Sequence, residues 1–133
     1  MPTLADVMIT DLKTIPCEAS VFDAARKMRV EKIGSLLVKR AGKLLRDQES
    51  KIIGLVSETD IIRKAVAEEK NLYETRVESI ITSPMITVGT TWPLEEAYEM
   101  MKQQEVRYLL VSESEKIVGL ISLRDILVSL KEP

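Results

Sequence analysis

Two motifs of the form Gly-apolar-apolar-Ser-x-x-Asp end in a serine and an aspartate three residues apart, Ser57 with Asp60 and Ser122 with Asp125. Each serine stands where a β-rich run gives way to helical spacing, so it marks the start of a helix. Free backbone N–H groups and the positive end of the helix dipole favour a phosphate at such a point. A carboxylate on the first turn can accept both hydroxyl hydrogens of a ribose. The motifs therefore indicate a site for a phosphorylated ribose-containing ligand.

The same residues also have a purely structural interpretation. Ser-x-x-Asp at a helix start can be a capping box, which stabilises a helix by about 1 kcal/mol. Gly54 and Gly119 lack a Cβ, which allows either a ligand or a neighbouring backbone to approach the strand end. The substitution Asp125→Asn separates the two interpretations, because loss of a cap leaves ligand affinity unchanged whereas loss of a ribose contact does not.

Both motifs lie within a repeat that covers most of the chain. Residues 5–38 align with residues 78–111 without a gap, and after a length difference residues 52–62 align with residues 117–127. A copy of about 60 residues would be marginal alone, because small domains bury too little surface. We therefore expect the two copies to share one core.

Each copy predicts the element order β-α-β-β-α, and hence an α+β fold. The helical spacing of apolar residues and the alternation of the β-rich runs define the elements. The first copy predicts a strand at 14–15, a helix from Ser20 to about Glu31, strands at 35–39 and 51–56, and a helix behind Asp60. The second copy predicts a strand at 86–88, a helix with Pro93 in its first turn, strands at 108–112 and 116–122, and a closing helix. The resulting division is residues 1–66, a linker at 67–76, and residues 77–133.

Composition excludes several kinds of chemistry. The 133-residue chain has no His and one Cys, Cys17. The commonest metal ligand and the commonest acid or base near neutral pH are therefore missing, as are disulfide and C-x-x-C sites. A net charge of −2 and five aromatic side chains offer little to nucleic acid. No apolar run approaches the roughly 20 residues that span a bilayer, and Asp6 and Asp11 interrupt a signal peptide, so we expect a cytoplasmic protein.

Two segments distinguish the copies in length. Residues 39–51 of the first copy contain eight extra residues, with five basic and two acidic side chains. We interpret this insertion as a longer, solvated basic hairpin, with a docking patch for an acidic partner as the alternative. Residues 67–76 are polar and predict a flexible linker, into which the preceding helix could also continue.

The two motif copies in this β-α-β-β-α frame resemble a tandem pair of CBS domains, the cystathionine-beta-synthase-type regulatory module. The resemblance covers nearly the whole chain and implies two pseudo-symmetric units packed sheet to sheet as one module. It also implies an adenosine-containing ligand, such as AMP, ADP, ATP or S-adenosylmethionine, in clefts between the two units. No cofactor other than this regulatory ligand is expected, and no metal.

The resemblance assigns residues to two clefts, each combining the Ser-x-x-Asp of one unit with segments of the other. The cleft of the second motif would contain Ser122, Arg124, Asp125, Arg107, Tyr108, Met8, Lys13, Ile33 and Gly34. The cleft of the first motif would contain Ser57, Thr59, Asp60, Gly34, Ser35, Ile81, Ile86 and Val106.

The two clefts differ in charge. Arg107 replaces Gly34 of the first copy, and Arg124 replaces Thr59. Arginine pairs strongly with phosphate oxygens, so we predict that the Ser122–Asp125 cleft binds phosphate more strongly. The alternative is that both arginines are solvated or paired with glutamates. Five apolar residues could hold an adenine or simply belong to the core: Met8, Ile33, Ile81, Ile86 and Val106.

The leading functional hypothesis is a non-catalytic regulatory module that passes a ligand-dependent conformational change to a partner. The resemblance implies a homodimer with contacts through exposed helix faces, and the receiver would be that dimer or an unidentified effector protein. A ligand-free structural or adaptor homodimer is the alternative from another class. Nucleic-acid binding through the insertion is a further one. An enzyme would have to rely on carboxylates such as Glu58 and Asp60 alone.

Overall fold

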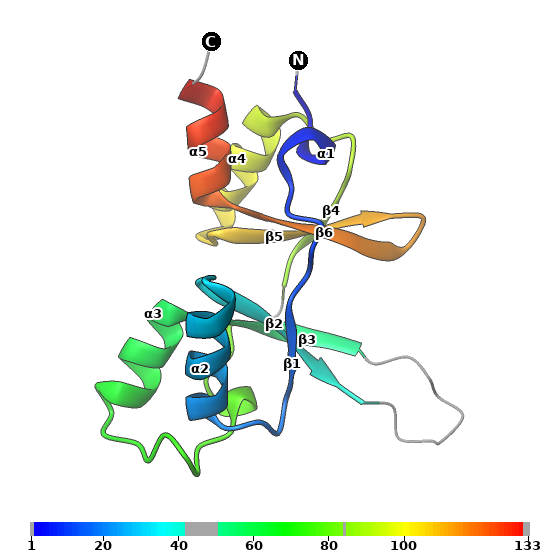
Figure 1. The fold of residues 1–133 in the computed structure, drawn as a ribbon. Coiled ribbons are helices and arrows are strands. Elements are labelled where there is room, and N and C mark those ends of the chain that lie inside the picture. The colour runs from blue at the N-terminus through cyan, green and yellow to red at the C-terminus, as the bar shows by residue number, and fades with distance from the viewer. Residues whose placement is uncertain (1, 42–50, 84, 132–133) are drawn as a thin grey trace. The chain divides into compact units, whose positions relative to one another are not determined.

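The computed structural model describes residues 2–41, 51–83 and 85–131, which fold into two compact α+β units (Figure 1). Lys13–Pro84 form what we call the first-copy unit. Met1–Leu12 and Met85–Pro133 form the second-copy unit. Each unit contains one three-stranded sheet with helices against it, so the predicted α+β class is confirmed. Among the described residues, no helix has the length and apolar character needed to cross a membrane.

The first-copy unit carries its sheet in the order β1-β2-β3. β1 runs parallel to β2, and β2 runs antiparallel to β3. Its elements are β1 (Thr14–Pro16), α2 (Val21–Glu31), β2 (Ser35–Arg40), β3 (Lys51–Ser57), α3 (Glu58–Ile61), a π-helix η1 (Ile62–Val66) and a 3₁₀ helix η2 (Val77–Ser79).

The second-copy unit repeats this topology in the order β4-β5-β6. The pairing again shifts register by one position, between Val111 and Ser112, as it does between Val38 and Lys39 in the first copy. Its elements are α1 (Leu4–Val7), β4 (Thr87–Gly89), α4 (Leu94–Gln104), β5 (Tyr108–Glu113), β6 (Lys116–Ser122) and α5 (Leu123–Lys131). The repeat is therefore structural as well as sequential.

The first long helix of each copy has the limits that its sequence predicts, with one correction. α2 begins after Ser20, whose hydroxyl accepts the N–H of Asp23 at 3.0 Å, and it ends at Glu31. α4 begins after Pro93, which is the N-cap residue and not part of the first turn. Proline suits that position because its nitrogen has no hydrogen to leave unpaired. Each helix is followed by a residue with a left-handed backbone, Lys32 after α2 and Glu105 after α4.

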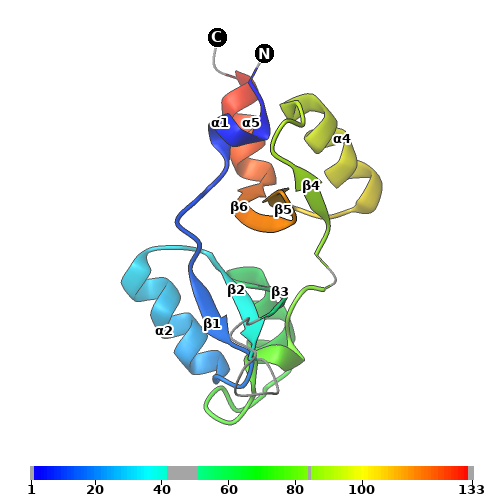
Figure 2. The same cartoon turned by 90° about the vertical axis from the view of Figure 1, so that its right-hand side faces the viewer.

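The start of each copy packs into the unit formed by the other copy. Leu4 is fully buried in the second-copy core, and Val77 and Ile80 are buried in the first-copy core. Figure 2 shows the blue N-terminal helix α1 beside the red C-terminal helix α5, and the two are in contact. We call residues 4–10 and 77–83 the exchanged segments. An isolated β-bridge joins each of them to the last strand of the sheet, Ile9 to Leu120 and Thr82 to Leu55. Among the described residues each unit has its own core, so the expected single shared core is wrong, and each core needs residues from both copies.

The glycines of the two motifs make room for these exchanged segments. A Cβ on Gly54 would lie 2.7 Å from the carbonyl oxygen of Thr82, and one on Gly119 would lie 2.5 Å from the sulfur of Met8. Of the two approaches that the sequence left open, a neighbouring protein segment occupies the space at both glycines. Residues 77–83, at the start of the second copy, belong to the first-copy unit.

The segment expected to be a flexible linker is folded onto the start of α2. The N–H groups of Val21 and Phe22 donate to the carbonyls of Thr75 and Leu72, both at 2.9 Å. The rings of Phe22 and Tyr73 stack with centroids 4.6 Å apart. Residues 67–76 are thus packed within the first-copy unit. Of the basic hairpin, β2 and β3 form the antiparallel strands, and residues 42–50 lie outside the described residues.

Candidate functional site: the two serine–aspartate motifs

The aspartate of the first-copy motif is buried and forms a capping box. Asp60 Oδ2 accepts the N–H of Ser57 at 3.0 Å and the hydroxyl of Ser57 at 3.1 Å. The N–H of Asp60 donates to Ser57 Oγ at 3.1 Å. This reciprocal pair begins α3, so the structural interpretation of the motif is realised here.

Two donors from outside the motif also contact Asp60. Lys64 Nζ lies 2.9 Å from Oδ1, and the Thr82 hydroxyl lies 3.2 Å from both carboxylate oxygens. Lys64 Nζ further donates to the carbonyl of Ile80 at 3.3 Å. We call Ser57, Asp60, Lys64 and Thr82 the Asp60 cluster. It joins β3, η1 and the exchanged segment, and it occupies both oxygens of the carboxylate.

The second-copy motif forms the same box with fewer neighbours. The Ser122 hydroxyl donates to Asp125 Oδ2 at 2.8 Å, the Ser122 N–H is 3.4 Å from that oxygen, and the Asp125 N–H donates to Ser122 Oγ at 3.1 Å. Asp125 is only partly buried. Within residues 2–41, 51–83 and 85–131 no donor contacts Asp125 Oδ1. The cap and a ligand can therefore use different oxygens of this carboxylate.

The positions equivalent to the two extra donors explain this difference. In the repeat, Lys64 corresponds to Ser129, and Thr82 corresponds to Ile9. The backbone around Ile9 matches that around Thr82, since Ile9 exchanges two hydrogen bonds with Leu120 at 2.8 and 3.0 Å. Only the side chains have changed. Asp125 therefore keeps an open oxygen because an isoleucine and a serine replace two hydrogen-bond donors.

The start of the middle strand lies beside the motif in each unit. Ser35 pairs with Ser57, and Tyr108 pairs with Ser122. The carbonyl of Gly34 accepts the N–H of Glu58 at 3.0 Å, and the carbonyl of Arg107 accepts the N–H of Leu123 at 2.8 Å. The structure therefore brings the predicted middle-strand residues to their own motifs.

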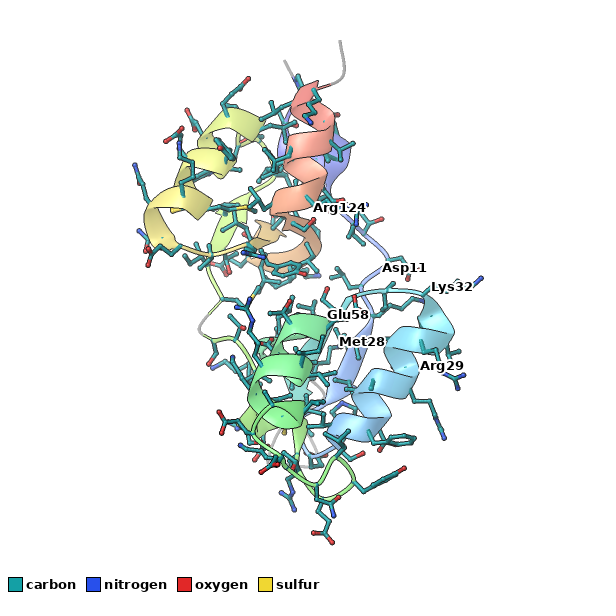
Figure 3. All side chains as sticks on the ribbon, turned by 90° about the vertical axis from the view of Figure 1, so that its left-hand side faces the viewer. Asp11, Met28, Arg29, Lys32, Glu58 and Arg124 are labelled. Carbon is teal, nitrogen blue, oxygen red and sulfur yellow. The ribbon has the colours of Figure 1, made fainter. Side chains whose placement is uncertain are left out.

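The charges next to the two motifs have opposite sign. In the second copy, Arg107 and Arg124 are both exposed, and Arg124 lies in the first turn of α5 (Figure 3). Neither arginine forms an ion pair with the described acidic residues, so pairing with glutamates does not occupy them. In the first copy, the carboxylate of Glu58 lies over Gly34, where a Cβ would be 2.6 Å from Glu58 Oε1. The second-copy motif is thus the more favourable place for an anion.

The other predicted residues divide between the units. Met8 packs on Gly119 near the second-copy motif, and Ile81 packs on Gly54 near the first-copy motif. Thr59 lies exposed in α3. The remaining assignments come from the opposite unit in each case: Lys13, Ile33 and Gly34 are in the first-copy unit, and Ile86 and Val106 are in the second-copy unit. All five apolar candidates are partly buried at the edge of a core.

Sequence reasoning missed three residues of this site: Lys64, Thr82 and Glu58. The signal for each was a mismatch between the copies, with Lys64 over Ser129, Thr82 over Ile9, and Glu58 over Leu123. These differences between the copies could not be interpreted from the sequence, because only the fold shows that residues 77–83 lie beside the first-copy motif.

Cys17 is a packing residue with a protonated thiol. It is buried, and its thiol donates to Glu18 Oε2 at 3.0 Å. That hydrogen bond, together with burial, raises the pKa of Cys17 to about 11. Because the thiolate is the nucleophile, this environment suppresses its reactivity. No group of acidic or cysteine side chains among the described residues is placed to hold a metal ion.

Comparisons with known proteins agree on one family. The CBS domain model matches residues 4–67 and 77–132. A protein with CBS domains from Burkholderia ambifaria superposes with a TM-score of 0.82 at 30% identity, covering 98% of this chain and 94% of that one. An uncharacterized conserved protein from Pyrococcus horikoshii gives 0.81 at 28% identity, covering 98% and 93%.

Curated relatives are longer than this chain. An uncharacterized protein of Methanopyrus kandleri is 31% identical over 84% of this chain, which spans 54% of that protein's length. CBS domain-containing proteins of Arabidopsis thaliana are 28% identical over 83% of this chain, which spans 19% of their length. Both copies match the family model and the fold agrees, so the chain belongs to the CBS domain family, as a tandem pair.

Proposed function

We propose that this chain is a non-catalytic regulatory module that binds an adenosine-containing ligand of the AMP, ADP or ATP type at its second-copy motif. CBS-domain proteins are generally regulatory modules without catalysis of their own. The single observation that carries the proposal is the open Oδ1 of Asp125, in a motif flanked by two exposed arginines, Arg107 and Arg124. A ribose hydroxyl can donate to that oxygen, and the arginines can donate to phosphate oxygens.

Helix α5 adds to phosphate binding at the same point. It is nine residues long and starts directly after Ser122, so its first N–H groups and its positive dipole end lie beside the serine. Arg124 contributes a full charge on the same turn. Adenine would lie against partly buried apolar residues such as Met8.

Regulation requires that the ligand distinguish two arrangements of the protein. A ligand shifts such an equilibrium only by its difference in affinity for the two states. The proposed receiver of the change is a second copy of this chain or a separate effector protein. Exposed apolar side chains on the helices offer a contact surface: Val30 on α2, Ile62 and Val66 on η1, and Leu127, Val128 and Leu130 on α5.

A ligand panel tests the proposal. AMP, ADP, ATP, GTP and S-adenosylmethionine are each titrated into the protein by calorimetry, with thermal unfolding measured in parallel. A ligand at 100 times its dissociation constant stabilises the folded state by about 2.7 kcal/mol. For a protein of this size that corresponds to a rise of about 8 °C in the unfolding temperature. The proposal expects this rise with at least one adenosine ligand, and no heat or shift with any of them contradicts it.

A matched pair of variants locates the effect. Arg124→Gln removes the charge at the second-copy motif, and Arg29→Gln removes an exposed charge on α2 (Figure 3). Loss of one charge-assisted hydrogen bond weakens binding by about tenfold or more. We expect that loss for Arg124→Gln alone.

The second candidate function is a ligand-free structural or adaptor homodimer. It is favoured by the capping boxes, which satisfy both serines without any ligand, and by the exposed apolar helix residues. Related cyanobacterial CBS-CP12 proteins, 26–28% identical to this chain, are described as hexameric. If the protein is such an adaptor, light scattering should show a stable oligomer. None of the ligands in the panel should then give heat in calorimetry or change the unfolding temperature.

A further inference from the structure

We propose that the first-copy motif is closed to ligand by the chain's own side chains, with the Lys64 ammonium and the Thr82 hydroxyl occupying Asp60 in place of a ribose. In this arrangement the Asp60 cluster is a latch that holds the exchanged segment of the second copy. The part of this inference that concerns ligand rests on the proposed function. The latch itself does not, and it is tested separately below.

The first support is the saturation of the Asp60 carboxylate. Its side chain is 8% exposed. Oδ2 accepts the N–H and the hydroxyl of Ser57, Oδ1 accepts Lys64, and the Thr82 hydroxyl lies 3.2 Å from both oxygens and has one hydrogen to donate. A carboxylate oxygen has two lone pairs, so Ser57 fills the ordinary capacity of Oδ2, and Lys64 with Thr82 fills that of Oδ1. An incoming diol would have to displace donors that are already in place.

The displaced donor would be a charged one. Lys64 Nζ lies 2.9 Å from Oδ1 and carries a full positive charge, whereas a ribose hydroxyl in its place would bring no charge to the carboxylate. The lysine side chain is 46% exposed, so water weakens this advantage without removing it. Exchange of the ammonium for a hydroxyl is therefore unfavourable at Asp60 and has no counterpart at Asp125.

Lys64 follows Asp60 by four residues, the spacing at which side chains on a helix are neighbours. After α3 the chain continues as the π-helix η1, whereas the equivalent residues of the second copy continue as the regular helix α5. Such π-helical turns are rare and frequently occur at functional sites. In η1 the lysine contacts both Asp60 and the carbonyl of Ile80, so it links the helix to the exchanged segment.

Electrostatics closes the same motif to phosphate. Glu58 lies over Gly34 at the start of α3, in the place where the second copy has Leu123 with Arg107. A phosphate brought to the first turn of α3 would meet a carboxylate. Moreover α3 and η1 together offer a short, irregular helix start, whereas α5 is a continuous nine-residue helix. Both parts of a nucleotide, the diol and the phosphate, are thus disfavoured at the first copy.

The repeat supplies the decisive variants. Lys64→Ser with Thr82→Ile introduces the second-copy residues into the first copy and frees Asp60 Oδ1. Ser129→Lys with Ile9→Thr does the reverse and installs a latch at Asp125. All four variants are analysed by calorimetric titration with ATP and with adenosine, alone and in these pairs. Adenosine brings no phosphate to Glu58, which these variants leave in place. Calorimetry gives the number of ligand molecules bound per chain. If Lys64 had only a structural role, its replacement would not change that number.

We expect the wild-type chain to bind nucleotide at a single site. The Lys64→Ser, Thr82→Ile variant should gain a second site for adenosine and keep the first, and the Ser129→Lys, Ile9→Thr variant should lose at least about 90% of its affinity, a tenfold change. Two equal sites in the wild-type chain would overturn the inference. An unchanged number of adenosine sites in the Lys64→Ser, Thr82→Ile variant, when the wild-type chain binds adenosine, would also overturn it.

Thermal unfolding tests the latch without any ligand. Loss of a capping box alone, as in Asp125→Ala, should lower the unfolding temperature by about 4 °C. Asp60→Ala also leaves Lys64 and Thr82 without their acceptor, and should lower it by about 10 °C. When Asp60→Ala is introduced into the Lys64→Ser, Thr82→Ile variant, it should lower the unfolding temperature by no more than Asp125→Ala does.

The two tests separate the two claims. If no adenosine ligand binds to the wild-type chain, the proposed function is wrong. The unfolding experiment still tests whether the Asp60 cluster holds the exchanged segment. If Asp60→Ala and Asp125→Ala lower the unfolding temperature equally, the latch is wrong whatever the ligand panel gives.

Discussion

Asp60 and Asp125 occupy equivalent positions in two units with the same topology, and both accept the hydroxyl of a serine three residues earlier. They differ in their surroundings, since Lys64 and Thr82 contact Asp60 while Ser129 and Ile9 stand in the equivalent positions near Asp125. The comparison teaches that the capping box is the shared scaffold of the motif. Whether the carboxylate has a free oxygen for a ligand depends on two neighbouring side chains.

The two exchanged segments show a similar contrast on a shared backbone. Both return to the opposite unit and pair with its last strand, through Ile9 with Leu120 and Thr82 with Leu55. The segment at residues 77–83 adds side-chain bonds to Asp60, whereas the segment at residues 4–10 relies on packing, with Leu4 and Met8 against the second-copy core. Exchange of these segments explains how two copies that are each too small to be stable complete their cores.

The largest expected contrast comes from the two motif glycines. A Cβ at position 54 would meet the backbone oxygen of Thr82, which cannot move without breaking the bridge to Leu55, whereas at position 119 it would meet the flexible end of Met8. Overpacking costs about 1–3 kcal/mol. We expect Gly54→Ala to lower the free energy of unfolding by about 3 kcal/mol and Gly119→Ala by about 1 kcal/mol. Urea denaturation measures both free energies of unfolding. Equal losses in the two variants would contradict the claim that the two exchanged segments pack differently on the two glycines.

The next contrast concerns the arginines of the second copy. Arg107→Gly with Arg124→Thr introduces the first-copy residues at both positions. Each lost charge-assisted bond to phosphate weakens binding by about tenfold, so the pair should weaken ATP binding by about 100-fold. Adenosine, which lacks phosphate, should bind the variant and the parent alike. A loss that is equal for ATP and adenosine would show that the arginines support the site in another way.

A titrating group distinguishes the copies at high pH. Cys17 has a pKa of about 11, raised from 9.0 by its hydrogen bond to Glu18 and by burial, while the equivalent residue of the second copy is Thr90. A raised pKa favours the protonated thiol in the folded state. The stabilisation is therefore complete below pH 9 and is lost as the pH rises towards 11.

Its full size is about 2.7 kcal/mol, from roughly two pKa units, and most of it is lost by pH 11. The matched control is Cys17→Thr, which introduces the second-copy residue. We expect the stability difference between the parent and this variant to shrink by about 2 kcal/mol between pH 8.5 and 11, measured by urea denaturation. A difference that stays constant over this range would show that the thiol is not held protonated.

The smallest expected effect tests the connection between the copies. Tyr73 is 70% exposed, yet its ring stacks on Phe22 at the start of α2. Such a pair contributes about 0.5–1.5 kcal/mol. We expect Tyr73→Ala to lower the unfolding free energy by about 1 kcal/mol, and Tyr73→Phe to leave it unchanged. Equal behaviour of both variants would mean that stacking does not hold residues 67–76 in place.

Much of the fold was predictable because both copies carry the same local signals. The cap at Ser20, the buried positions Val21, Ala24 and Met28, and the glycine in each last strand predicted elements that the structure confirms. The exchange of the first segments was not predictable in this way. Its helices span only three or four residues, at Leu4–Val7 and Val77–Ser79, and their burial depends on contacts far away in sequence.

The candidate site was predictable in kind and incomplete in detail. Ser122, Asp125, Arg107 and Arg124 follow from the motif and from comparison of the copies. Lys64 and Thr82 could not be assigned, because a lysine one turn after Asp60 looks like a solvated surface residue and Thr82 lies 22 positions from Asp60. The fold alone brings both donors to one carboxylate.

The most direct test of the central claim compares Asp60→Asn with Asp125→Asn. Both substitutions preserve side-chain size and leave one oxygen to accept a hydrogen bond from serine, and circular dichroism confirms that each variant is folded. ATP affinity is then measured by calorimetry. We predict that Asp125→Asn weakens binding by about tenfold or more, and that Asp60→Asn binds within about twofold of the parent. Equal loss in both variants, or a larger loss in Asp60→Asn, would contradict the account.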